Sequence, residues 1–261
     1  MDDGDFNSSA SANVAPPETV SGSRWTFARH WRDNVGYYGL ARHLLELASG
    51  AWRTLLEFLP SRRKASFGDL DFDWEHSVDT TRSNVGFRTQ LFTGLAGRHY
   101  FATEPWLFQQ IMQAMPTDFT HFTFVDLGSG KGRVLLMASD YGFQRIVGVE
   151  FVAELHRVAE KNIVSYANAR QLCRQIKSLC MDAHDFQFPA DPLVVYLFNP
   201  FAEPTFAYVL ESLRVSVEQR PRPVYIAYRF TEFDKLLAQA NWLEKVAATE
   251  QWAVYRNRAL T

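Results

Sequence analysis

The stretch FVDLGSGKGR, residues 124–133, decides the fold of this chain. Apolar residues come first, and glycines then stand at the alternating positions 128, 130 and 132. This pattern predicts a buried strand that turns sharply into a helix, because glycine has no β-carbon to obstruct a tight turn or a closely approaching ligand. Amides at the start of that helix would face the crevice beyond the strand, where doubly wound sheets bind their ligands.

Two phosphate-binding motifs are excluded at this loop. A phosphate loop built around Lys131 would need glycine at 125 and serine or threonine at 132, where valine and glycine stand. A dinucleotide fingerprint would need its last glycine at 133, where arginine stands. The carboxylate of Asp126 also repels a dianionic pyrophosphate, and it suits a cationic ligand instead. The loop therefore favours a cation over a phosphate.

Strands and helices alternate downstream of the loop. We expect strands at 121–127, 145–150, 175–181, 193–200 and 223–230, and helices at 132–142, 153–166, 206–218 and 232–240. Near-continuous apolar strands in such an alternation predict a parallel sheet covered on both faces. Two further strands, near 242–249 and 251–256, are joined by so few residues that they must form an antiparallel hairpin. The expected fold is α/β, a Rossmann-like doubly wound and mostly parallel seven-stranded sheet with a C-terminal antiparallel hairpin.

Helical spacing also marks the chain upstream of the loop. Residues 104–115 are predicted to form a helix with Pro105 near its first turn. Residues 35–60 carry apolar side chains at helical spacing, interrupted by charged ones, which predicts an amphipathic helix or a helical pair. That element would pack on the main domain, or else bind a membrane surface or form a homodimer.

An acidic stretch, residues 69–76, lies between these helices. Leucine, phenylalanine and tryptophan alternate with acids here, which predicts a short extended segment with one buried face. A calcium loop is excluded, because Trp74 stands where the tight turn needs glycine. Metal binding by Asp73, Glu75 and His76 remains open as an alternative.

Composition and charge bound the class of protein. A chain of 261 residues fits one α/β domain with an extension, and we expect a disordered tail at 1–24, a helical or lid extension at 25–98 and the main domain at 99–261. A net charge of -2 argues against general nucleic-acid binding, so no nucleic acid is expected as a partner. The two cysteines are too few for a disulfide framework and fit a reducing compartment, the cytoplasm. Neither a signal peptide nor a transmembrane segment is expected.

Residues 125–132, VDLGSGKG, resemble the first motif of class I S-adenosylmethionine-dependent methyltransferases. The order of elements from residue 122 to the C-terminus is similar to that family too. The resemblance implies S-adenosylmethionine as the cofactor, with the glycine loop against its methionyl part and the leading acid holding its ammonium group directly or through water. The implied cofactor residues of this loop are Asp126, Gly128, Ser129, Gly130 and Gly132.

The same resemblance assigns residues after the second and third strands. The family has an acid at the end of its second strand that takes both ribose hydroxyls, and Glu150 fills that place. Phe151 beside it would pack on the adenine or in the core. The family often has an acid after the third strand that accepts from the adenine amino group. Asp182 with Ala183 matches this best and Asp185 is a fallback, and a helix cap or solvated turn is the alternative role for Asp182.

The methyl acceptor would lie at the end of the fourth strand. Asn199-Pro200-Phe201 resembles the Asn/Asp-Pro-Pro-Tyr/Phe motif of amino-group methyltransferases, whose polar side chain and proline carbonyl accept from the target nitrogen. Only one proline stands before the ring here. Tyr100 and Thr103 lie in a segment similar to one in a loosely defined group of uncharacterised bacterial methyltransferases and in seven-strand protein-lysine methyltransferases. By that likeness both would reach the methionyl end of the cofactor or cover its methyl group.

Methyl transfer itself needs little side-chain chemistry. The nucleophile must sit in line, roughly 3 to 3.5 Å from the methyl carbon, in a water-excluded pocket. An amine must first lose a proton, which Tyr100, His184 or Asp185 could relay while Asn199 and the Pro200 carbonyl orient the nitrogen. The favoured hypothesis is a methyltransferase that acts on an amine, such as a protein lysine. A small-molecule O- or N-methyltransferase and a non-catalytic binding module of this fold are the alternatives.

Overall fold

The computed structural model describes residues 70–81, 102–115, 118–198, 201–229 and 233–258. The predicted tail at 1–24 and the predicted helices within 35–60 lie outside these residues. The homodimer contact expected from those helices therefore stays a prediction, as does the division of the chain at residues 24 and 98.

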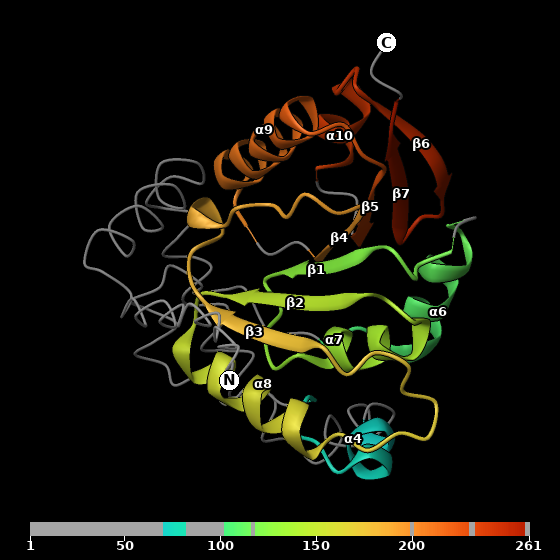
Figure 1. Ribbon diagram of the computed structural model, residues 1–261, viewed down its shortest axis with the longest axis vertical. Coiled ribbons are helices and arrows are strands. Elements are labelled where there is room, and N and C mark those ends of the chain that lie inside the picture. Colours follow the sequence, from blue (N-terminus) through green and yellow to red (C-terminus); the bar gives the residue numbers. More distant parts are fainter. Residues whose placement is uncertain (1–69, 82–101, 116–117, 199–200, 230–232, 259–261) are drawn as a thin grey trace, which may run out of the picture.

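A seven-stranded sheet forms the centre of the described domain, with the order β3-β2-β1-β4-β5-β7-β6 (Figure 1). The strands are β1 Thr123–Leu127, β2 Arg145–Glu150, β3 Ile176–Cys180, β4 Leu193–Phe198, β5 Val224–Arg229, β6 Leu243–Ala248 and β7 Trp252–Asn257. The first five strands pair in parallel, and β7 is antiparallel to both β5 and β6. The predicted fold class is confirmed, including its C-terminal hairpin.

The central strands are buried on both faces, as their apolar sequences predict. Every residue of β1 and of β5 is buried. Successive side chains point to opposite faces, so Phe124 and Tyr196 enter one core cluster while Val125 and Val195 enter the other. A sheet buried on both faces places its polar residues at the strand ends, where the candidate site lies.

Helices cover both faces of the sheet (Figure 1). On one face lie α6 Pro105–Gln113, α7 Arg133–Ala138 and α8 Ala153–Ser165, and on the other α9 Glu203–Gln219 and α10 Asp234–Gln239. The predicted helix at 132–142 is divided into α7 and a 3-10 helix, η2 Ser139–Tyr141, and another 3-10 helix, η3 Ala183–Asp185, follows β3. The helix α9 begins earlier than predicted because Pro204 is accommodated in its first turn, where a helix needs no amide hydrogen from that residue.

The segment Leu70–His76 is a helix, α4, so the prediction of an extended segment was wrong. Its apolar residues do not share one buried face, because Phe72 is 9% exposed and Trp74 is 90% exposed. Phe72 and His76, four residues apart, instead lie on one side of the helix, with ring centroids 4.6 Å apart. Acids in the first turn also favour a helix. Packing of Phe72 against the rest of the chain outweighs the alternating local pattern.

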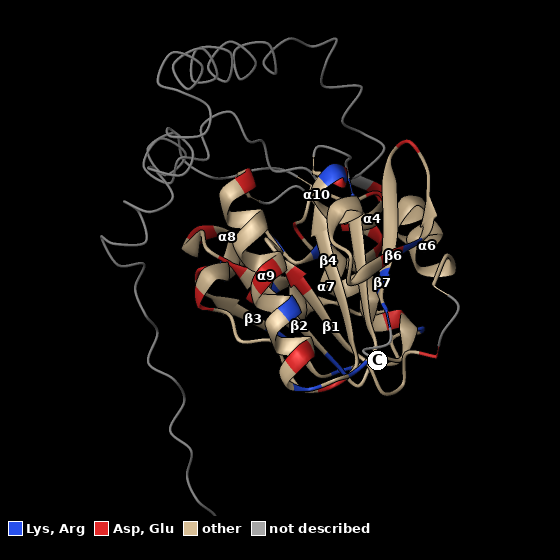
Figure 2. Cartoon of the chain, turned by 90° about the horizontal axis from the view of Figure 1, so that it is seen from above, with Lys and Arg blue, Asp and Glu red and all other residues tan. Residues whose placement is uncertain are grey.

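The outer face of α9 is charged and lies away from the strand ends (Figure 2). Arg214 pairs there with Glu211 at 2.6 Å and also with Glu218. Ion pairs on a solvent face contribute little to stability. The ion pairs on this face are those of an ordinary solvent-exposed helix surface.

Candidate functional site

The glycine loop joins β1 to α7 through three residues with left-handed backbone. Gly128, Gly130 and Gly132 have φ angles of 85°, 55° and 84°, a region that side chains disfavour. At Gly132 a β-carbon would also lie 3.2 Å from the β-carbon of Ala159 on α8. The Gly128 amide donates to the Val149 carbonyl at 2.8 Å, which holds the loop against β2. The loop therefore requires glycine for its turn and for its approach to α8.

A further glycine, Gly148 on β2, gives the loop its space and was not singled out from the sequence. It is the register partner of Asp126. A β-carbon at Gly148 would lie 2.6 Å from Leu135 Cδ1 and 2.7 Å from Ser129 Oγ. A glycine inside an apolar strand often marks such a close approach, and that signal could have identified it.

The hydroxyl of Ser129 is a buried polar group of the glycine loop. Its oxygen is buried and has no hydrogen-bond partner within the described part of the chain. A buried polar atom without a partner costs free energy, so a ligand group that bonds to it would be favoured. This orphaned atom fits the methionyl part of the implied cofactor, which carries hydrogen-bonding groups.

Glu150 meets the glycine loop at the end of β2, and its predicted role at the ribose stays a prediction. Its side chain is 7% exposed. One carboxylate oxygen accepts from the Gly130 amide at 2.8 Å and the other from the Val152 amide at 2.7 Å. Phe151, between Glu150 and the start of α8, is half-buried. The carboxylate is thus held in one orientation beside the loop.

Asp126 is a buried acid beside this glutamate. It is 3% exposed, and burial raises the pKa of its carboxyl well above the ordinary value, with the nearby charge of Glu150 raising it further. Two carboxylates in a buried site favour either a proton or a bound cation. The site therefore has the electrostatics to hold an ammonium group.

Thr103 is buried next to the same strand ends. Its hydroxyl and that of Tyr196 lie 2.8 Å apart, and Tyr196 is the β4 neighbour of Asp126 in the sheet register. Burial raises the pKa of the Tyr196 phenol far above its ordinary value, although the bond with Thr103 opposes the shift. The phenol is therefore neutral, and its contact with Thr103 fixes the segment before α6 against the sheet.

The residues after β3 form a capped turn. The Asp182 carboxylate accepts from the His184 amide at 3.0 Å and lies 2.9 Å from His184 Nδ1. Asp182 thereby caps η3, which is the structural role that the sequence left open for it. Ala183 is buried, and the His184 ring lies 4.6 Å from that of Tyr208 on α9. Asp182 and Ala183 are thus fixed beyond the end of β3.

The structure places only part of the predicted acceptor region. Tyr100, Asn199 and Pro200 lie outside the described residues, so their roles stay predictions. Phe201 is 7% exposed and packs in the core cluster that includes Leu197. It therefore anchors the chain directly after the strand end.

An ion pair that the sequence analysis missed borders this region. Arg229, the last residue of β5, lies 2.8 Å from the Glu104 carboxylate. The Arg229 guanidinium also lies over the ring of Phe198, 4.2 Å from its centroid. The pair links the residue before α6 to the tip of β5, next to the predicted acceptor motif.

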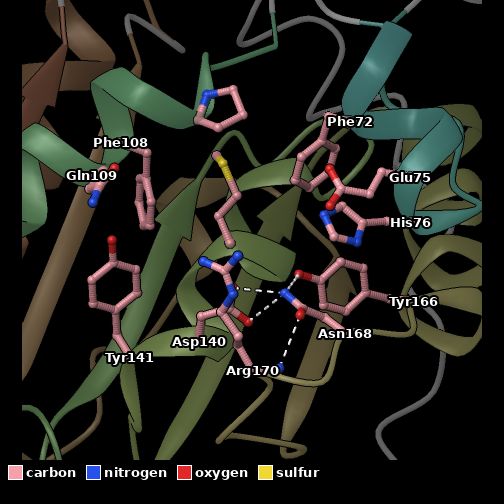
Figure 3. Close-up of a pocket in the computed structure, with 12 residues that line it drawn as sticks. Phe72, Glu75, His76, Phe108, Gln109, Asp140, Tyr141, Tyr166, Asn168 and Arg170 are labelled. Atoms are coloured by element: carbon pink, nitrogen blue, oxygen red, sulfur yellow. Dashed lines mark hydrogen bonds between the residues drawn. The ribbon is translucent and has the colours of Figure 1, made fainter.

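A separate cavity of about 450 Å³ lies among α4, α6 and the residues that follow α7 and α8 (Figure 3). The rings of Phe72, Phe108 and Tyr166 border it. On one wall, the Asn168 amide donates to both carboxylate oxygens of Asp140, at 3.1 and 2.9 Å. The predicted cofactor residues do not line this cavity, so it is distinct from the crevice at the strand ends.

Within the described residues, no group of three or more histidine, cysteine, aspartate and glutamate side chains is placed to hold a metal ion. Asp73, considered as a ligand from the sequence, accepts instead from the Thr80 and Thr81 amides at 2.9 and 2.8 Å. The same part of the chain contains no helix with the length and apolar character to cross a membrane.

Comparison with known proteins identifies one matching family model. Residues 95–188 match the family described as histone methylation protein DOT1. The matched region contains Thr103, the glycine loop, Glu150 and Asp182. No curated protein matches the chain.

Several solved structures are similar in fold. An RNA methyltransferase of Salinibacter ruber, solved with S-adenosyl-L-homocysteine, is 21% identical, with 59% of this chain and 91% of that chain covered and a TM-score of 0.41. A putative methyltransferase of Escherichia coli is 14% identical, with 61% and 89% covered and a TM-score of 0.45. A ribosomal protein L11 methylase of Lactobacillus delbrueckii subsp. bulgaricus is 16% identical, with 70% and 83% covered and a TM-score of 0.42. At such identities and scores, none of the three informs the acceptor of this chain.

The strand order is the firmest indication of the fold family. The order β3-β2-β1-β4-β5-β7-β6, with β7 antiparallel, is that of the class I methyltransferase fold. The glycine loop after β1 and the acid at the end of β2 stand where that fold binds S-adenosylmethionine. Ser129 and the buried acids fit that cofactor chemically.

Proposed function

We propose that this chain, a class I S-adenosylmethionine-dependent methyltransferase, transfers its methyl group to an amine, with a protein lysine as the acceptor. One observation carries the choice of acceptor. Residues 95–188 match a family described as histone methylation protein, and this region contains the residues assigned to the cofactor. The lysine acceptor comes to this chain from that description.

Bound S-adenosylmethionine supplies a methyl group on a sulfonium, which an in-line nucleophile can take. The residues of this chain bind the cofactor and hold it in position. Asp126 accepts from the cofactor ammonium, whose positive charge offsets the repulsion between Asp126 and Glu150. Ser129 bonds to the same methionyl part through its buried hydroxyl.

Glu150 and Asp182 hold the nucleoside part. Each oxygen of a carboxylate can accept more than one hydrogen bond, so Glu150 retains lone pairs for the ribose hydroxyls after binding the Gly130 and Val152 amides. Asp182, oriented by its two contacts with His184, accepts from the adenine amino group.

The acceptor nitrogen is oriented at the tip of β4. Phe198 ends the strand and Phe201 is buried in the core, and we assign Asn199 and Pro200, which stand between them in the sequence, to the acceptor. Their side-chain and carbonyl oxygens accept hydrogen bonds from the amine and leave its lone pair directed at the methyl group. A lysine ammonium must lose a proton first, and Tyr100, His184 and Asp185 are the candidates to relay that proton to solvent.

Some aromatic residues of the described domain serve packing. Phe108, Phe124, Phe143 and Tyr196 pack against one another in the core. Packing between the sheet and the helices accounts for these four rings, whereas Phe72 and Tyr166 border the separate cavity.

A labelling experiment tests the acceptor. The purified chain is incubated with tritiated-methyl S-adenosylmethionine and a cell extract divided into protein and small-molecule fractions, with core histones as a further arm. We expect label in protein, and acid hydrolysis should release it as methylated lysine. Label confined to the small-molecule fraction would overturn the lysine acceptor while leaving the methyltransferase class intact. The Asp126→Asn variant is the negative control.

A further inference from the structure

Both cationic side chains of the glycine loop are buried. Lys131 is 0% exposed and Arg133 is 1% exposed, which is unusual for these residue types. A buried charge is costly unless opposite charges or several hydrogen bonds compensate it. Compensating groups come from residues 73–81, at least 52 positions earlier in the sequence.

Lys131 is joined to the end of this earlier segment. Its ammonium lies 2.8 Å from the Asp79 carboxylate, whose side chain is 53% exposed. Asn162 of α8 bonds to both residues. Its amide group donates to the main-chain carbonyls of Asp79 and Lys131, each at 2.9 Å. The Asn162 side-chain oxygen also accepts from the Asp79 amide at 2.9 Å.

Arg133 is held by the same segment. Its guanidinium donates to the hydroxyls of Thr80 and Thr81, each at 2.6 Å, and lies 3.3 Å from the Asp73 carboxylate. The Phe72 ring lies 4.9 Å from the centre of the guanidinium. The first turn of α7 is thus bonded to residues 72–81, which we call the clamp segment.

We infer that the clamp segment positions the glycine loop for the cofactor, and that Asp79 is a positioning residue that acts through Lys131. Lys131 stands between Gly130 and Gly132. A movement that takes its ammonium into water would therefore also move both glycines. Because the Gly130 amide bonds to the acid assigned to the ribose, such a movement would disturb two parts of the cofactor site together.

The coupling must operate in both directions. The helix α4 has seven residues, too few to be stable alone, so it depends on its contacts with the rest of the chain. Figure 3 shows that Phe72 and His76 of α4 border the separate cavity, and Phe72 also packs in the core, so the bonds to the glycine loop are one of the attachments of this segment. A ligand that stabilises the loop should therefore stabilise the docked clamp segment by the same free energy.

This inference rests on cofactor binding at the glycine loop and not on the identity of the methyl acceptor. Binding of S-adenosylhomocysteine can test it, whereas the lysine acceptor is tested by methyl transfer. Failure of one proposal is thus distinguishable from failure of the other.

Calorimetry on five variants of the full chain provides the first test. Asp79→Ala should weaken S-adenosylhomocysteine binding about fivefold or more, and Asp79→Asn should recover part of the loss because its amide oxygen still accepts from Lys131. In the Lys131→Met background, Asp79→Ala should cause no further loss, since the interaction is already absent. Asp71→Ala, which removes an exposed acid of α4 eight positions before Asp79, is the matched control.

Hydrogen exchange provides a readout that a purely structural role would not change. In the unmodified chain, S-adenosylhomocysteine should slow amide exchange at residues 78–81 about fivefold or more, and Asp79→Ala should reduce this protection. The unfolding midpoint of each variant checks that the fold is retained. Equal affinities of Asp79→Ala and Asp71→Ala, or unchanged exchange at 78–81 on binding, would overturn the inference. If Asp79→Ala does not fold, the inference is tested by the exchange measurement on the unmodified chain: slower exchange at 78–81 on binding supports it and unchanged exchange overturns it.

Discussion

At the scale of single residues, Asp126 has opposite effects on stability and on binding. Burial and the charge of Glu150 raise the pKa of its carboxyl, so the folded state holds the proton more tightly than the unfolded state. This tight binding contributes stability that is present at low pH and is lost as the pH rises through the raised pKa. A bound ammonium would stabilise the ionised form of Asp126 and so lower the pKa of its carboxyl.

Asp126→Asn should therefore stabilise the unliganded protein and weaken its binding. At pH 8 we expect an unfolding midpoint higher by about 2–4 °C, and the difference should disappear below the ordinary pKa of an aspartate, where the wild-type carboxyl is protonated in both the folded and the unfolded state. Affinity for S-adenosylhomocysteine should fall about tenfold or more, because a charge-assisted bond is lost. Thermal unfolding and calorimetry measure both effects. Wild-type affinity in this variant would show that Asp126 does not hold the ammonium.

The affinity of the wild-type chain for S-adenosylhomocysteine should also depend on pH. Only ionised Asp126 binds an ammonium well, so the dissociation constant should decrease as the pH rises through the raised pKa of this carboxyl. In the Asp126→Asn variant this part of the pH dependence should be absent. Calorimetry over a pH series measures it, and identical profiles for the two proteins would contradict the assignment.

Glu150→Ala should weaken cofactor binding by about 1 to 3 kcal/mol. The carboxylate both holds the Gly130 amide and is assigned to the ribose, so its removal affects the loop and the ligand together. Glu150→Gln keeps an acceptor oxygen, so its affinity for the cofactor should fall less than that of Glu150→Ala. Unchanged affinity in the alanine variant, measured by calorimetry, would mean that the acid at the end of β2 is wrongly assigned.

Asn199→Ala tests the acceptor assignment. Because Asn199 is proposed to orient the amine and not the cofactor, kcat should fall about 10- to 100-fold while the affinity for S-adenosylhomocysteine stays nearly unchanged. Steady-state rates on the labelled protein acceptor and calorimetry give the two numbers. Equal losses in kcat and in the affinity for S-adenosylhomocysteine would mean that Asn199 stabilises the cofactor site and does not orient the amine.

At the scale of elements, β2, the glycine loop and α7 are packed too closely for any side chain at Gly148. The strand, the loop and the helix meet there, with Leu135 and Ser129 nearest to the position of a β-carbon. The packing of these elements therefore determines where the loop lies. A larger residue in β2 should displace the loop and so alter the cofactor site.

Gly148→Ala should destabilise the protein by about 1–3 kcal/mol, because the added carbon would lie 2.6 Å from Leu135 Cδ1. Chemical denaturation measures the change. Leu135→Val removes that Cδ1 atom, so a double-mutant cycle should give a favourable coupling between the two substitutions. A Gly148→Ala protein as stable as the wild type would contradict the packing described for this element.

The same scale explains why α4 was predicted incorrectly. Leu70, Phe72 and Trp74 follow the period of a strand, and the local sequence gives no sign of the distant residues that α4 contacts. Phe72 packs in the core with residues far along the chain, and Arg133 is bonded to Thr80, just after α4, across 53 positions. Local patterns cannot identify such partners, since the fold alone brings them together.

At the scale of the whole molecule, the sequence predicts the architecture well because alternation leaves few topologies. Apolar strands separated by helices require a covered parallel sheet, and the short last link requires a hairpin. Parallel strands also end at one edge, so Asp126 and Glu150 could be expected to meet there. The contacts of Thr103 with Tyr196 and of Lys131 with Asp79 could not be expected, because they join positions 93 and 52 residues apart.

A crystal structure of the full chain with S-adenosylhomocysteine tests the central claim most directly. It should show the ligand across the carboxyl ends of β1 and β2, with its ammonium within hydrogen-bond distance of Asp126 or joined to it by one water. Both ribose hydroxyls should donate to Glu150. A crevice left empty at saturating ligand, or a ligand bound elsewhere on the domain, would contradict the account.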